Sequence, residues 1–143
     1  TTRPFELFGA PYVDSAELIR ALDAHGLPGV RFRSASFTPT FDKYTGELCH
    51  GAQIHVSDVE SYRSYDTAVA IVRDLRRLYP EHFEWRRDAY EFVDDIPAFD
   101  LLAGSSALRE GIEAGSTLTD LRATWAEEEA TWREELAEMY LYP

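Results

Sequence analysis

The stretches GAQIHV (residues 51–56) and YDTAVAIVRDLRRLY (residues 65–79) decide the fold. In the first, apolar residues alternate with Gln53 and His55, which predicts a strand with one apolar and one polar face. In the second, apolar residues recur every three or four positions, which predicts an amphipathic helix that ends at Pro80. The apolar stripe predicted for this helix consists of Ala68, Val72, Leu75 and Tyr79, with Ile71 and Leu78 beside it.

Weaker patterns flank this strand and helix on both sides. Asp14 and Glu17 have the spacing of a capping box at the start of a helix, which Gly26 ends. Further strands are predicted at residues 30–33, 36–41, 83–85 and 90–93, and further helices at residues 105–112 and from Thr117 towards the C-terminus. Because strands and helices do not alternate strictly, we expect the α+β class, with a small mixed sheet packed with about four helices, including a long C-terminal helix. The length predicts a single domain over residues 1–143.

Composition disfavours several classes of function. The formal net charge of −12 argues against binding to nucleic acid or to anionic lipid, because both need a cationic surface. No apolar run approaches the roughly 20 residues of a membrane-spanning helix, so no membrane insertion is expected. Cys49 is the only cysteine and the histidines lack metal-ligand spacing. We therefore expect no internal disulfide, no metal site and no cofactor.

A second apolar stripe runs along the predicted C-terminal helix. Its members are Leu118, Leu121, Trp125, Trp132, Leu136 and Met139. Packing of this stripe in the core is the simpler interpretation, because amphipathic helices bury their apolar face. The alternative is a seam that docks on another domain.

Aromatic and polar side chains offer the ingredients of a sugar-binding site, in which flat rings and a few polar groups are combined. Candidate platforms are Tyr12, Phe32, Phe37, Phe41, Tyr44 and Trp85, and candidate polar contacts are Arg3, Arg31, Gln53 and His55. Glu6 is the one acid among aromatic residues, where burial would raise a carboxyl pKa, and its alternative role is a cap or an ion pair. A single aromatic residue is more often part of a core, so these residues alone leave the function open.

Ordered segments along nearly the whole chain carry a family resemblance. They include Thr2-Arg3-Pro4-Phe5-Glu6, Gly9-Ala10-Pro11-Tyr12, Leu27-Pro28-Gly29-Val30-Arg31-Phe32, Gly51-Ala52-Gln53-Ile54-His55-Val56, Phe83-Glu84-Trp85 and Phe99-Asp100-Leu101-Leu102-Ala103-Gly104. No single segment is diagnostic, but the ordered set resembles the C-terminal part of the NamZ-like family of peptidoglycan exo-β-N-acetylmuramidases.

This resemblance implies an exo-acting glycosidase that releases N-acetylmuramic acid from the non-reducing ends of peptidoglycan fragments. It implies that residues 1–143 are the C-terminal domain of a longer protein and complete a cleft with a preceding Rossmann-like domain. The main catalytic glutamates are expected on that preceding domain, so we expect this chain alone to be inactive. The parent protein is expected outside the cytoplasm, as a secreted, periplasmic or cell-wall-associated protein.

The resemblance also selects the candidate site residues. The expected substrate-binding residues are Arg3, Glu6, Tyr12, Arg31, Tyr44, Gln53 and His55. Arg3 or Arg31 is expected to pair with the lactyl carboxylate of the muramyl sugar, because guanidinium–carboxylate contacts are strong and directional. Glu6 is a weak catalytic candidate. Two other functions stay open: a non-catalytic glycan-binding module, and a structural domain, which a flat apolar patch around Trp125 and Trp132 would favour.

Overall fold

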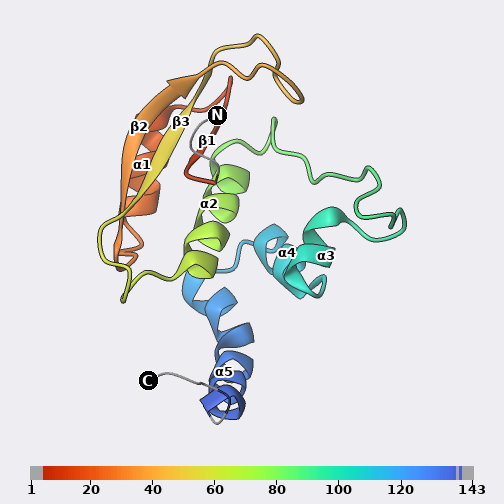
Figure 1. Cartoon of the computed structure of the whole chain (residues 1–143). Coiled ribbons are helices and arrows are strands. Elements are labelled where there is room, and N and C mark those ends of the chain that lie inside the picture. The colour runs from red at the N-terminus through yellow and green to blue at the C-terminus, as the bar shows by residue number, and fades with distance from the viewer. Residues whose placement is uncertain (1–4, 138, 140–143) are drawn as a thin grey trace. The chain divides into compact units, whose positions relative to one another are not determined.

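The chain folds as two units whose boundary in the sequence lies between Glu84 and Trp85. The structure is a computed structural model that describes residues 5–137 and residue 139 (Figure 1). No helix in this described part is long and apolar enough to cross a membrane.

The first unit contains a three-stranded sheet and two helices. Its elements are β1 (Leu7–Ala10), α1 (Ser15–Asp23), β2 (Val30–Phe37), β3 (Cys49–Val56) and α2 (Ser64–Leu78). The strand order is β1-β3-β2, and β3 pairs antiparallel with both neighbours. Strand β3 therefore lies between β1 and β2, which are separated in the chain by α1 (Figure 1).

The α+β class is confirmed, but the sheet is antiparallel rather than mixed. The helical connection through α1 gives β1 and β2 the same direction, as helical crossovers do for parallel strands. Because β3 lies between them and runs the opposite way, no parallel pair forms. The extended piece predicted at residues 36–41 is partly wrong, since β2 already ends at Phe37.

Helix α1 begins where the sequence predicts. The carboxylate of Asp14 accepts a hydrogen bond from the backbone N–H of Glu17 at 2.9 Å, which caps the first turn. Leu18 and Leu22 of α1 are fully buried. On the sheet, Ala10, Val30 and Ala52 lie on one face by the strand register and are also buried, so this face carries the core of the unit.

The apolar stripe predicted for α2 is confirmed in part, since Tyr79 and Ile71 are buried and Val72 and Leu75 are half-buried. Ala68 is exposed, whereas Thr67 and Asp74 are buried together with apolar residues of the same helix. Both polar side chains have partners inside the unit: Thr67 Oγ1 donates to Arg63 O at 2.8 Å, and Asp74 Oδ2 lies 2.8 Å from His25 Nε2. Polar groups with internal partners can occupy a core position, which an apolar pattern does not reveal.

The second unit is helical in its described residues. Its elements are α3 (Ala98–Ala103), α4 (Ala107–Glu113) and α5 (Leu118–Ala137). Helix α5 starts after Thr117, as predicted, and Thr117 Oγ1 accepts a hydrogen bond from Asp120 N at 3.1 Å. The sequence missed α3, and the structure has five helices over its described residues where about four were expected.

The strands predicted at residues 83–85 and 90–93 do not form. Only an isolated bridge joins Tyr90 and Val93. Between them, Glu91 and Phe92 have φ angles of 50° and 67°, in the left-handed region that turns use and strands do not. The segment is therefore a tight turn, with its two central residues exposed.

The core role predicted for the stripe of α5 is wrong for Trp132 and Met139, whereas Leu118, Trp125 and Leu136 are half-buried. Leu121 is the one buried residue within Leu118–Ala137. Trp132 keeps 59% of its surface exposed, and Met139, which follows the helix, keeps 72%. A long apolar stripe needs a facing surface to be buried, and this prediction assumed one.

Candidate functional site

Four polar side chains of β2 and β3 lie on the open face of the sheet. The strand register places Arg31 opposite His55 and Arg33 opposite Gln53. Opposed residues of an antiparallel pair point to the same face, so these four side chains form one group. Arg31, Arg33 and His55 are exposed, in contrast to the buried face that holds Ala52.

Gln53 is the fixed centre of this group, because it is only 3% exposed and both ends of its amide have partners. Its Oε1 accepts a hydrogen bond from Arg33 Nη2 at 2.7 Å, and its Nε2 donates to Glu6 Oε2 at 3.4 Å. The backbone holds Glu6 beside the sheet, since Ile54 N donates to Glu6 O at 2.7 Å. The structure thus brings together Glu6, Gln53 and Arg33, of which sequence reasoning had missed Arg33.

Arg31 differs from Arg33, because its side chain forms no hydrogen bond to another described residue. Over the described residues, the Arg31 guanidinium makes no ion pair or side-chain hydrogen bond, and its cross-strand neighbour is the exposed His55. Two arginines and one glutamate make this face locally cationic in a chain of net charge −12. A planar guanidinium with its donors directed to solvent is suited to bind a carboxylate in a bidentate manner.

Tyr12 and Tyr44 are brought together in a separate aromatic group. The Tyr12 ring centroid lies 6.4 Å from that of Tyr44 and 5.6 Å from that of Tyr79, and the Tyr12 ring stacks on His82 at 4.9 Å and 17°. Tyr12 follows β1, whereas Glu6 precedes it, so the aromatic group and the polar group are at opposite ends of this strand.

This aromatic group is a packed cluster more than an open platform. Burial raises the pKa of Tyr12 to about 12, and the neighbouring Tyr44 and Tyr79 add to the shift. Tyr79 anchors the cluster to α1, because its hydroxyl accepts a hydrogen bond from Asp14 N at 3.0 Å. Among the other candidate platforms of this unit, Phe32 and Phe37 are half-buried, and Phe41 is exposed.

The structure describes Cys49 but not Arg3. Arg3 lies outside the described residues, so its predicted role stays a prediction. Cys49 is fully buried, and burial raises the pKa of its thiol, which suits a structural role in the core. Within residues 5–137 and 139, no group of three or more histidine, cysteine and carboxylate side chains has the arrangement to hold a metal ion.

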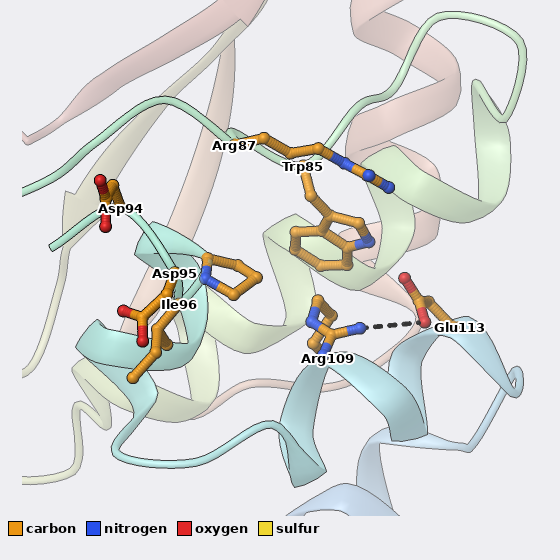
Figure 2. Close-up of a pocket in the computed structure, with 8 residues that line it drawn as sticks. Trp85, Arg87, Asp94, Asp95, Ile96, Arg109 and Glu113 are labelled. Carbon is orange, nitrogen blue, oxygen red and sulfur yellow. Dashed lines mark hydrogen bonds and ion pairs between the residues drawn. The ribbon is translucent and has the colours of Figure 1, made fainter.

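A pocket of about 330 Å³ lies in the second unit, and sequence reasoning had named only one of its residues. The lining residues, shown in Figure 2, are Trp85, Arg87, Asp94, Asp95, Ile96, Pro97, Arg109 and Glu113. They come from the segment before α3 and from α4, and no short motif joins them. The one signal in the sequence was Trp85 followed by a polar stretch with the pair Asp94-Asp95.

Comparison with known proteins gives one family match. A model of the C-terminal domain of the exo-β-N-acetylmuramidase NamZ matches residues 1–142. It spans both units, which the structure separates at Glu84 and Trp85.

Two relatives extend this match. The peptidoglycan β-N-acetylmuramidase NamZ of Bacillus subtilis (strain 168) is 42% identical over 121 residues, which cover 85% of this chain and 27% of that protein. The crystal structure of a DUF1343 family protein from Bacteroides fragilis matches with a TM-score of 0.78 and 26% identity, and covers 98% of this chain and 36% of the other. The chain thus spans about a quarter of the curated relative, at 27% of its length.

Proposed function

The chain belongs to the family of C-terminal domains of the exo-β-N-acetylmuramidase NamZ, and we propose that it supplies sugar-binding residues to a peptidoglycan β-N-acetylmuramidase. The 42% identity to the Bacillus subtilis enzyme supports this substrate class. The reaction is the release of N-acetylmuramic acid from the non-reducing ends of peptidoglycan fragments. The parent protein acts outside the cytoplasm, where peptidoglycan is found.

The catalytic glutamates belong to a preceding domain, for which a Rossmann-like fold is proposed. A glycosidase uses two carboxyl groups held at a defined separation on either side of the scissile bond. On the open face of the sheet, the acid found among the described side chains is Glu6, and it is tied to Gln53. The role of this face is therefore binding, and we expect the 143-residue chain alone to leave a chromogenic N-acetylmuramide uncleaved.

Arg31 is the residue that carries this proposal. N-Acetylmuramic acid differs from N-acetylglucosamine by a lactyl ether that ends in a carboxylate. The unengaged guanidinium of Arg31 binds that carboxylate, and His55, directly opposite on β3, adds a second polar contact. Arg33 is already engaged by Gln53, so it holds the wall of the site and contributes charge.

The test compares two sugars and four proteins. N-Acetylmuramic acid and N-acetylglucosamine are titrated into the wild-type chain and into the Arg31→Ala, Arg31→Lys and Arg20→Ala variants, with binding followed by NMR. We expect Arg31→Ala to weaken binding of N-acetylmuramic acid about tenfold or more, since a hydrogen bond to a charged group is worth about 1.5–3 kcal/mol.

The controls separate charge from geometry. Arg31→Lys keeps the charge and loses the planar fork, so its binding is intermediate. Arg20→Ala removes an equal charge from an exposed position of α1 and leaves binding unchanged. Equal affinity of the wild-type chain for the two sugars, or full affinity of the Arg31→Ala variant, would contradict the proposal.

A second candidate function is a domain that packs on and stabilises its neighbour. The exposed Trp132 of α5 and Met139, which follows the helix, favour it, because large apolar side chains in contact with water often mark an interface. This role does not exclude sugar binding, since it uses side chains of the second unit, whereas Arg31 belongs to the first.

A further inference from the structure

The pocket of the second unit has one apolar side. Trp85 packs against Phe99 with a centroid distance of 4.6 Å, which fixes the indole ring. Ile96 and Pro97 continue the same lining. An indole held in this way offers a flat, rigid surface, and such surfaces bind the C–H face of a pyranose ring at little cost in conformational entropy.

The polar side of the pocket is equally fixed. Arg109 donates to both carboxylate oxygens of Asp100, from Nε to Oδ1 at 2.9 Å, from Nε to Oδ2 at 3.1 Å and from Nη2 to Oδ2 at 2.9 Å. Asp100 is only 6% exposed, so this pair is a rigid anchor. Arg109 Nη1 also donates to Glu113 Oε2 at 3.3 Å, which holds the Glu113 carboxylate at the pocket, as Figure 2 shows.

The charges of the lining select the kind of ligand. Arg87 and Arg109 provide donors, whereas Asp94, Asp95 and Glu113 provide acceptors. Because both signs are present, a strongly anionic or cationic ligand meets repulsion as well as attraction. A neutral ligand with many hydroxyl groups uses donors and acceptors together. The volume of about 330 Å³ is at the lower end of ligand pockets, which suits a single sugar ring.

We propose that this pocket binds a neutral N-acetylhexosamine ring of the glycan, stacked on Trp85 and hydrogen-bonded by Arg87, Asp95 and Glu113. The inference rests on the proposed function for its substrate class, and it adds a second sugar contact to the one at Arg31. Charge distinguishes the two contacts: Arg31 suits the carboxylate of a muramyl sugar, whereas the pocket at Trp85 suits an uncharged sugar.

The test uses the indole N–H signals of the three tryptophans, Trp85, Trp125 and Trp132, in NMR spectra of the ¹⁵N-labelled chain. Each signal is assigned with a Trp→Phe variant, and the probe is a β-1,4-linked trisaccharide of N-acetylglucosamine. We expect a saturable shift of the Trp85 signal and no shift of the signal of the exposed Trp132.

Two exposed lining residues supply variants that keep the fold. Arg87→Ala and Asp95→Ala are expected to weaken binding of the trisaccharide at least about fivefold with unchanged circular dichroism, since each loses one hydrogen bond. Arg31→Ala is expected to leave the Trp85 response unchanged. A Trp85 signal that moves no more than that of Trp132, or a response that both lining variants retain in full, would overturn the pocket proposal. Loss of the Arg31 dependence for N-acetylmuramic acid, with the Trp85 response intact, would instead overturn the proposed function.

Discussion

In the first unit even a charged side chain is enclosed, whereas in the second unit most of the longest helix is in contact with water. Asp74 of α2 is fully buried and has three basic neighbours. Over Leu118–Ala137, by contrast, Leu121 is the one buried residue. The first unit therefore has a complete interior of its own, and α5 presents apolar side chains that still lack cover.

This difference suits the two units to different roles, ligand binding in the first and contact with another surface in the second. The proposed carboxylate contact at Arg31 belongs to paired strands over a closed core, which fix the position of its backbone. The exposed end of α5, with Trp132, has the character of a contact surface. Three measurements test the contrast between an enclosed and an uncovered region.

The largest effect is expected from Asp74→Ala in the first unit. The Asp74 carboxylate lies 2.8 Å from His25 Nε2, 3.0 Å from Arg73 Nη1 and 3.3 Å from Arg77 Nε. Its removal leaves these groups without their common partner, so we expect the free energy of unfolding to fall by about 3–5 kcal/mol in urea titrations followed by circular dichroism. The exposed Asp23→Ala serves as control and should change it by less than about 0.5 kcal/mol. A loss below about 1 kcal/mol for Asp74→Ala would show that the enclosed charge is not essential to this core.

An intermediate loss of stability is expected from Leu121→Ala, and Trp132→Ala on the same helix is the variant for comparison. Leu121 is 2% exposed, and it packs so closely on α4 that a Cβ added at Gly111 would lie 2.6 Å from Leu121 Cδ2. We expect Leu121→Ala to lower the free energy of unfolding by about 2–3 kcal/mol. Trp132→Ala, at an exposed position, should stay within about 0.5 kcal/mol. Equal losses for the two variants in thermal or urea unfolding would mean that Trp132 is covered in solution.

The smallest effect concerns alkaline pH and Tyr12. Burial raises the pKa of Tyr12 to about 12, whereas a tyrosine in the unfolded chain titrates near 10. Between these pH values the Tyr12 hydroxyl keeps its proton in the folded chain and has lost it in the unfolded chain. The contribution of Tyr12 to the free energy of unfolding is therefore complete below pH 10 and is lost as the pH rises towards 12. We expect Tyr12→Phe to lose less stability than the wild type between pH 9 and pH 11 in urea titrations. If both proteins lose the same free energy of unfolding over this pH range, Tyr12 is not the cause of the loss of stability at alkaline pH.

Local signals in the sequence predicted the parts of the fold that depend on neighbouring residues. The cap at Asp14, the start of α5 after Thr117 and the two faces of β3 each follow from a pattern within a few residues, and all three are confirmed. The α+β class follows from the same patterns. The turn at Glu91 and Phe92 was missed, because aromatic residues beside acids resemble a strand until the backbone angles are known.

The remaining features depend on partners far away in the sequence. The burial of Asp74 was not predicted, because its partner His25 lies 49 residues earlier in the chain. Gln53 was expected to line a cleft, and the structure buries it between Arg33 and Glu6. The Trp85 pocket combines residues up to Glu113, so only the folded backbone brings them together. Tyr12 and Tyr44 were expected at the site individually, and their mutual contact emerges only in the fold.

The position of β3 between β1 and β2 also dictates an order of assembly. Strands β2 and β3 are neighbours in the chain and close a short loop, whereas β1 must wait for β3 to be in place before it has any partner. Closing the longer loop costs more entropy, so we expect the hairpin to form first and β1 to add last during folding. Glu6 joins Gln53 only at that final step, so the open face of the sheet is completed late in refolding.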